Sequence, residues 1–204
     1  MKTTKLEPLL EKPTKTLMER WLSVYKANDC LVQSDELQRR LADSFTDDYA
    51  GILSVVVFLN QIYSTNLYLN DVYRMAGHIY NRRDAVRPLI AAGSPEAVAM
   101  IACGHGIARK GCRESVLYSF ASKFCNFLNP DCYPIFDSHV EQMLKAYNRK
   151  YGFRADGRGN LRDYAVFRDC VRSFIEYFGL ECTFWESDKF LWTYYDSLKT
   201  DNER

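Results

Sequence analysis

Apolar residues recur along most of the chain at the three-to-four-residue spacing that is typical of amphipathic helices. The pattern predicts helices at about residues 16–28, 35–44, 48–63, 70–92, 95–104, 116–128, 138–151, 161–178 and 186–198. We find no convincing alternation of apolar and polar residues, and residues 180–185 are the only candidate for a short strand. The sequence therefore predicts an all-α fold, a compact multi-helix domain.

Two helix starts in the first half of the chain carry side-chain signals. Ser34 or Asp35 can cap the second predicted helix, and Asp35 fits better because Gln38 follows three residues later, as in a capping box. Asp47 or Asp48 can cap the third. Since this third helix is apolar on all sides, we expect it to be the central buried element.

Proline and glycine mark further boundaries. Pro88 is predicted to kink or split the fourth helix. Ser94 and Pro95 form a strong start for the fifth, with a capping hydroxyl and a proline in the first helical position. That helix ends at Gly104 and Gly106, which we interpret as a C-terminal cap and turn, because no strand precedes them as in a phosphate-binding loop.

The chain is organised around residues 119–140, SFASKFCNFLNPDCYPIFDSHV. This stretch predicts a helix, a break at Asn129 and Pro130, a short extended link and a second helix. Asp137 stands where the N-cap of the second helix belongs, and Glu141 lies in its first turn.

Lys123 lies at the edge of the apolar stripe of the first of these helices, beside Val116, Phe120 and Phe127. One interpretation is structural: the aliphatic stem packs on the core and the ammonium reaches water. The other is chemical: partial burial lowers the pKa of the lysine, so that its amine becomes a nucleophile.

A lysine on a helix followed by a turn and by Asp-Ser-His-Val resembles the helix-hairpin-helix DNA glycosylase superfamily, most closely its 8-oxoguanine glycosylase branch in a divergent bacterial form. The resemblance implies that Lys123 is the nucleophilic lysine and Asp137 the aspartate that caps the next helix, with His139 after it. The motif covers about 22 residues, and its helical context about 100. The implied fold is a glycosylase-like domain with a degenerate helix-hairpin-helix.

The chain departs from the family pattern in three ways. Ser119 and Ala121 stand where the hairpin has glycines whose backbone amides bind a DNA phosphate. The spacing from Lys123 to Asp137 is 14 residues, about one helical turn shorter than in the family. The cysteine tail that binds an iron–sulfur cluster in some relatives is absent, so no such cluster and no other cofactor is expected.

The resemblance implies an enzyme that excises a damaged base, such as an oxidised purine, from double-stranded DNA and nicks the strand as an AP lyase. The deprotonated amine of Lys123 would attack the sugar C1′ and form a Schiff base, while Asp137 would position the amine and stabilise the developing positive charge. The alternative is a catalytically inactive helical module of the same fold that binds nucleic acid or a protein.

The formal charge of +1 does not by itself favour a DNA-binding protein, so the distribution of charge matters more. One basic cluster, Arg109, Lys110 and Arg113, precedes the motif. A second follows it and includes Lys145 and Arg149. Either these residues form a phosphate-binding surface or they are the solvated face of a helix and a basic loop.

Composition limits the remaining possibilities. The 204 residues, 47% of them hydrophobic, predict one folded domain, with residues 1–45 as a helical extension of a core at 46–204. The longest apolar run, Ile52–Leu59, is too short to span a membrane, and no secretory signal is visible. We therefore expect a cytoplasmic protein.

The seven cysteines form no Cys-x-x-Cys pair, and most fall in apolar helical patterns. They are best interpreted as reduced core thiols. Cys103 with His105, or Cys125 with Cys132, could meet in space, but the spacing offers no ligand cluster for zinc, so no metal site is expected.

Overall fold

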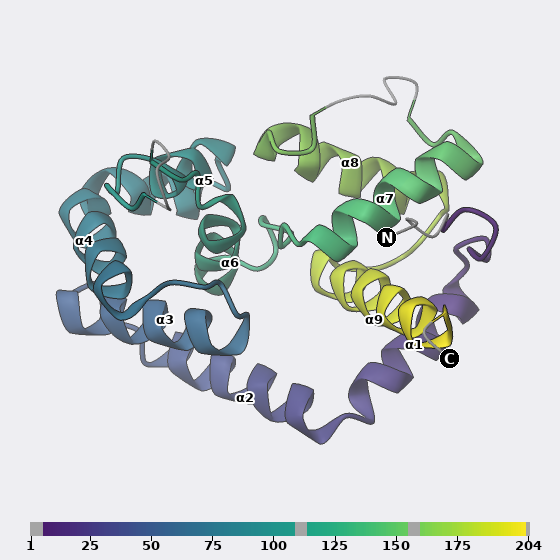
Figure 1. The fold of residues 1–204 in the computed structure, drawn as a ribbon, viewed down its shortest axis with the longest axis horizontal. Coiled ribbons are helices and arrows are strands. Elements are labelled where there is room, and N and C mark those ends of the chain that lie inside the picture. Colours follow the sequence, from purple (N-terminus) through teal and green to yellow (C-terminus); the bar gives the residue numbers. More distant parts are fainter. Residues whose placement is uncertain (1–5, 109–113, 155–159, 203–204) are drawn as a thin grey trace. The chain divides into compact units, whose positions relative to one another are not determined.

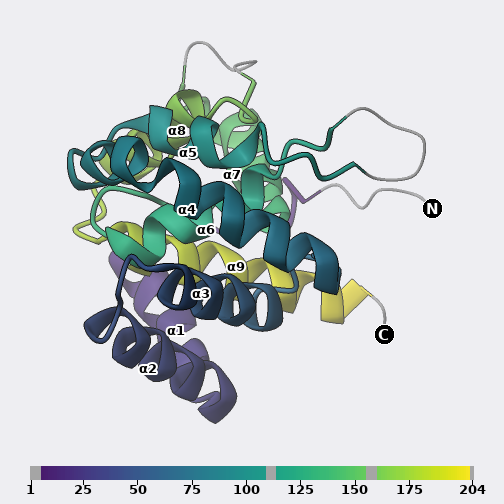
Figure 2. The same cartoon turned by 90° about the vertical axis from the view of Figure 1, so that its left-hand side faces the viewer.

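A computed structural model describes residues 6–108, 114–154 and 160–202 of the chain. Over these residues it contains nine α-helices and no strand apart from one isolated bridge, between Ala108 and Glu114, which confirms the predicted all-α class. The helices, drawn in Figures 1 and 2, belong to two compact units. The middle unit is Gln33–Ile135, and the terminal unit combines the residues up to Val32 with those from Phe136 onwards.

Apart from its first helical segment, residues 33–43, the middle unit is a ring of four helices: α3 (Tyr49–Ile62), α4 (Leu69–Ala91), α5 (Pro95–Ala102) and α6 (Tyr118–Leu128). Each of these helices packs on two others: α4 contacts α3 and α5, and α6 also contacts α3 and α5 (Figure 1). Val55, Met75, Ile101 and Phe124, one from each helix, are at most 1% exposed and form the core. Burial of these side chains is the main stabilising term of the unit.

The central buried helix is α6, and the prediction that residues 48–63 would fill this place is wrong. Every residue from Phe120 to Phe127 is buried. On α3, by contrast, Val57 is half exposed and Tyr49 is also exposed. An apolar run shows that a helix can be buried, but its neighbours decide which of its sides are covered.

The terminal unit contains α1 (Lys15–Lys26), α7 (Ser138–Tyr151), α8 (Tyr164–Tyr177) and α9 (Phe184–Asn202). Helix α9 packs on the other three. The hydroxyl of Tyr194 on α9 accepts a hydrogen bond from the Glu11 amide, and Trp21 of α1 stacks on the Tyr194 ring. The N-terminal segment is therefore part of this unit, and the structure does not divide the chain at residue 45, where the sequence suggested an extension.

Three of the predicted N-caps are confirmed, for α3, α5 and α7. The side chains of Asp48, Ser94 and Asp137 accept hydrogen bonds from the amides of Gly51, Glu96 and His139. The predicted glycine turn after α5 is also present, because Gly104 and Gly106 have positive φ angles. Local sequence signals placed these ends correctly because the capping bonds form within three residues.

Two predicted element boundaries are wrong because a side chain caps the helix start at an earlier residue than predicted. Helix α2 (Asp29–Asp43) begins before Ser34 and Asp35, because the side chain of Asn28 accepts a hydrogen bond from the Leu31 amide and acts as the cap. The candidate strand at 180–185 is instead the segment before α9 together with the first two residues of that helix, whose start is closed by reciprocal hydrogen bonds between Thr183 and Glu186.

The described helices show two further features. Helix α4 continues through Pro88 to Ala91 and is not split there, although it ends only three residues after the proline. In the part of the chain that the structure covers, no helix is both long and apolar enough to cross a bilayer.

Two helical glycines should respond in opposite ways to alanine. Around Gly77 in α4, a Cβ atom would have no neighbour within 4 Å, so Gly77→Ala should stabilise the protein by about 0.5–1 kcal/mol through the lower entropy of the unfolded chain. At Gly51 in α3, a Cβ would overlap the carbonyl oxygen of Thr46, and Gly51→Ala should destabilise the protein. Urea denaturation of both variants measures the difference, and equal effects would contradict this packing.

Candidate functional site

The motif residues are divided between the two units. Ser119, Ala121 and Lys123 lie on α6 in the middle unit, whereas Asp137 and His139 lie at the start of α7 in the terminal unit. The surroundings of each group are therefore described within its own unit.

Lys123 is buried, with only 3% of its surface exposed. Its Nζ donates a hydrogen bond to Ser119 Oγ at 2.6 Å and lies 5.4 Å from the centre of the Tyr63 ring. Ser119 is one turn earlier on the same helix, and Tyr63 is the C-cap residue of α3. The hydroxyl of Tyr63 in turn donates to Gln38 Oε1 at 2.9 Å. The amine is thus held by a hydroxyl and beside an aromatic face, in a buried position where a charge is costly.

Two other buried polar side chains on α6 hold the helix and the link that follows it. Ser122 Oγ donates to the carbonyl of Ser119 at 3.0 Å, and Asn126 Nδ2 donates to the carbonyl of Tyr133 at 2.7 Å. The Tyr133 hydroxyl, also buried, donates to the carbonyl of Ser94 at 2.8 Å. The bonds of Asn126 and Tyr133 tie the link after α6 to the start of α5, so that the C-terminal end of the helix bearing Lys123 is fixed.

Ser119 and Ala121 lie inside a regular helix. The amide of Ala121 donates to the carbonyl of Leu117 at 3.0 Å, and the Ala121 side chain is fully buried. This amide is therefore used within α6, and contact with a phosphate would depend on other residues of the chain.

Asp137 is the N-cap of α7. One of its oxygens, Oδ1, accepts from the His139 amide at 2.7 Å, and the carboxylate side chain is 27% exposed. The helix dipole favours a negative charge at this position. Asp137 is thus a fixed carboxylate that solvent can reach.

His139 is packed against α9. Its ring stacks on Tyr195, with the ring centres 4.3 Å apart, and its Nδ1 lies 3.9 Å from Asp137 Oδ1. Burial lowers the pKa of His139, and the nearby Lys199 lowers it further, whereas Asp137 and Asp196 act in the opposite direction. Burial is the largest of these effects, so the ring favours its neutral form and offers a phosphate a hydrogen bond instead of a full charge.

The two basic candidates that the structure describes are both engaged in ion pairs. Lys145 pairs with Glu141 one turn earlier on α7, and Arg149 pairs with Glu7. Arg109, Lys110 and Arg113 lie outside the described residues. The positive charge of Lys145 and Arg149 is thus partly balanced, although both side chains are about half exposed and within reach of a competing anion.

Within the described ranges, no group of three His, Cys, Asp or Glu side chains could hold a metal ion. Cys125 is buried on α6, and burial raises the pKa of its thiol. Such a thiol stays protonated and behaves as an apolar core group.

The sequence interpretation missed two residues at these positions, Tyr63 beside Lys123 and Tyr195 beside His139. Both are distant in sequence from the residues that they contact, and no local signal marks them. A third contact could have been predicted from the sequence, because Ser119 and Lys123 are four residues apart, the spacing at which helical side chains meet.

Comparison with known proteins gives two matches. The model of the HI_0787_N family, described as an N-terminal domain, matches residues 15–132. A protein of Haemophilus influenzae described as an uncharacterized protein is 33% identical over 152 residues, which cover 74% of this chain and 68% of that protein. No solved structure matches significantly. Neither match names a DNA glycosylase, so that resemblance stays a prediction. The family match includes Lys123 and ends before Asp137.

The lowered pKa of His139 predicts a titration and a loss of stability in acid. By NMR, His139 should titrate below the ordinary histidine value of about 6.5. The histidine binds a proton more readily in the unfolded chain than in the folded protein, because its pKa is lower in the folded state. The contribution of His139 to the free energy of unfolding is therefore complete above the unfolded pKa of about 6.5. It is lost as the pH falls towards the folded pKa.

Removing the cover over the ring with Tyr195→Ala should raise the midpoint towards 6.5. Removing the nearby negative charge with Asp137→Asn should lower it further. A midpoint above 6.5 in the unmodified protein would contradict the assigned dominance of burial.

Proposed function

This chain belongs to the HI_0787_N family, and we propose that it is a DNA glycosylase with AP-lyase activity. It would excise a damaged base, such as an oxidised purine, from double-stranded DNA in the cytoplasm, as a base-excision repair enzyme. The observation that carries the proposal is the setting of Lys123, a buried amine hydrogen-bonded to Ser119 and placed beside the Tyr63 ring. The motif resemblance supplies the reaction.

The proposed reaction begins with the neutral amine of Lys123. Its lone pair attacks the sugar C1′ while the bond from C1′ to the base breaks, and the base leaves with the bonding electrons and takes up a proton. Opening of the sugar ring gives a Schiff base between Nζ and C1′. Loss of a proton from C2′ then expels the 3′ phosphate, and water releases the lysine. Burial assists the first step because it disfavours the ammonium form of an amine.

The proposal assigns charge stabilisation to Asp137. Attack at C1′ develops positive charge on the sugar, and a carboxylate can stabilise this charge if it reaches the same nucleotide. The carboxylate of Asp137 is fixed by its capping bond and remains partly exposed, as this role requires. The role also requires that the bound state bring Lys123 and Asp137 to one nucleotide.

Phosphate binding is assigned to side chains, because the amide of Ala121 is used inside α6. Lys145 and Arg149 are about half exposed and can turn from Glu141 and Glu7 towards phosphate oxygens. His139 can add a hydrogen bond. Binding through such contacts should weaken steeply as salt is raised.

A second candidate function is a catalytically inactive module of the same fold that binds nucleic acid or a protein. Its supporting observation is that Ser119 and Ala121 lie within a regular helix in place of a phosphate-binding hairpin. In that case the bond from Lys123 to Ser119 only satisfies a buried amine, and Asp137 only caps α7.

Borohydride trapping separates the two functions. The full chain is incubated with duplexes that contain an abasic site or an 8-oxoguanine, and sodium borohydride reduces any Schiff base to a stable adduct. We expect an adduct that Lys123→Met abolishes, because this substitution removes the amine and keeps an apolar chain of similar length. The matched control is Lys189→Met, which changes the other buried lysine of the described chain and should keep the adduct.

Asp137→Asn tests the carboxylate in the same assay. Asparagine is a good N-cap, so α7 is retained while the charge is lost, and the trapping rate should fall about tenfold or more. Circular dichroism verifies that each variant is folded. An adduct that survives Lys123→Met would contradict the proposed nucleophile. Absence of any adduct with the unmodified chain, together with salt-sensitive binding, would favour the inactive module.

A further inference from the structure

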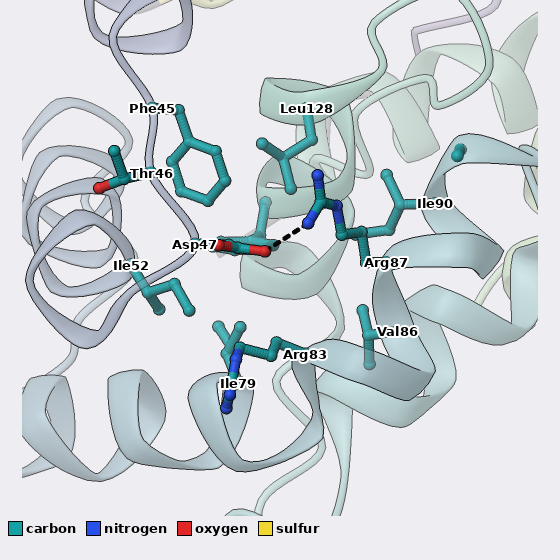
Figure 3. Close-up of a pocket in the computed structure, with 12 residues that line it drawn as sticks. Phe45, Thr46, Asp47, Ile52, Ile79, Arg83, Val86, Arg87, Ile90 and Leu128 are labelled. Atoms are coloured by element: carbon teal, nitrogen blue, oxygen red, sulfur yellow. Dashed lines mark hydrogen bonds and ion pairs between the residues drawn. The ribbon is translucent and has the colours of Figure 1, made fainter.

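The middle unit contains a pocket that is lined by none of the candidate site residues named above, Lys123 included. Its volume is about 480 Å³, within the range of small-molecule sites. The walls come from the segment before α3, from α3 itself, from α4 and from the last turns of α6. Figure 3 shows Phe45 and Leu128 on one side of the pocket and Ile52 and Ile79 on another.

The inner wall of this pocket is apolar and rigid. Ile52, Ile79, Val86, Ile90 and Phe124 line it, and each is at most 4% exposed. They belong to the core of the four-helix ring, so their positions are fixed by packing on more than one helix. Such a wall accepts an apolar group without rearrangement.

The polar side of the pocket carries two arginines and one aspartate. Arg87 Nη1 pairs with Asp47 Oδ2 at 2.6 Å, and this pair joins α4 to the segment before α3 (Figure 3). Both side chains are well exposed, at 74% for Arg87 and 45% for Asp47, so a ligand can compete for this ion pair.

Arg83 is the less exposed of the two arginines, at 34% of its side chain. Its guanidinium lies 4.2 Å from the centre of the Tyr80 ring, and Nη1 donates to the carbonyl of Tyr80 at 2.8 Å. Its Nε also lies 3.9 Å from the exposed carboxylate of Asp84. A guanidinium has five N–H donors, and the hydrogen bond to Tyr80 uses one of them. Arg83 is therefore held in place one turn from Arg87, and little side-chain entropy is lost when it binds an anion.

From this arrangement we propose that the pocket binds a small apolar carboxylate. The apolar body would lie against Phe124 and the isoleucines, and the carboxylate would bind Arg83 and Arg87. Among the residues that line the pocket, the two arginines and Asp47 leave one net positive charge, which matches a monoanion. Asp84, which pairs with Arg83 at 3.9 Å, lies outside the lining and is 93% exposed, so water screens its charge. Asp47 acts as an internal competitor, because it occupies in the free protein the guanidinium that the ligand would bind.

Calorimetric titration of the full chain with 2-naphthoate tests the proposal. We expect 2-naphthoate to bind, and its neutral analogue 2-naphthalenemethanol to bind about tenfold more weakly, since a charge-assisted hydrogen bond is lost. Arg83→Gln and Arg87→Gln should each weaken the binding of 2-naphthoate by about tenfold. Arg74→Gln, which makes the same charge change on α4 outside the pocket, should leave the affinity unchanged.

Two further variants distinguish the pocket from a non-specific apolar surface. Asp47→Asn should strengthen 2-naphthoate binding by about threefold, because it frees Arg87, and Asp48 still caps α3. Ala91→Trp should abolish binding, because Ala91 lines the pocket and is exposed, so a large side chain can fill the space without disturbing the core. Equal binding of the alcohol and the carboxylate, no binding at millimolar concentration, or full affinity in Ala91→Trp would overturn the proposal.

Discussion

Helix α6 imposes the main physical constraint on the middle unit, because eight consecutive residues of this helix are buried. A helix with no exposed side must satisfy every polar side chain internally, since an unpaired buried group costs stability. Ser122 and Lys123 meet this demand through Ser119, one turn earlier, and Asn126 meets it through the link after the helix. The same bonds fix the link through Tyr133, so the burial of α6 also determines where the chain leaves the unit.

Local chemistry explains how much of the fold could be predicted from the sequence. The caps at Asp48, Ser94 and Asp137 form within three residues, and the sequence identifies them. The start of α2 was missed because Asn28 competes as a cap, and the relative burial of α3 and α6 was missed because it depends on neighbours distant in sequence. The grouping of the first helix with the last three is likewise a long-range property, set by packing of α1 on α9.

In the candidate site, too, local contacts could be predicted from the sequence and long-range contacts could not. Lys123 stood out in the sequence because it lies at the edge of an apolar stripe. Its contact with Ser119 could be predicted from their four-residue spacing. Tyr63 lies 60 residues before Lys123, so periodicity could not find it. The partner of Arg149, a basic residue after the motif, could not be predicted either, because Glu7 lies near the other end of the chain. Charge clusters in a sequence indicate a surface potential only after such distant partners are known.

The two buried lysines of the described chain differ in what their neighbours permit. Lys189 lies 3.5 Å from the carboxylate of Asp188 and forms an ion pair with it. Lys123 contacts the hydroxyl of Ser119, and a hydroxyl can accept a hydrogen bond from an ammonium or donate one to a neutral amine. The ring of Tyr63 favours the cation, whereas burial opposes it. The hydrogen bond between Lys123 and Ser119 is thus compatible with both the structural and the nucleophilic interpretation of this lysine.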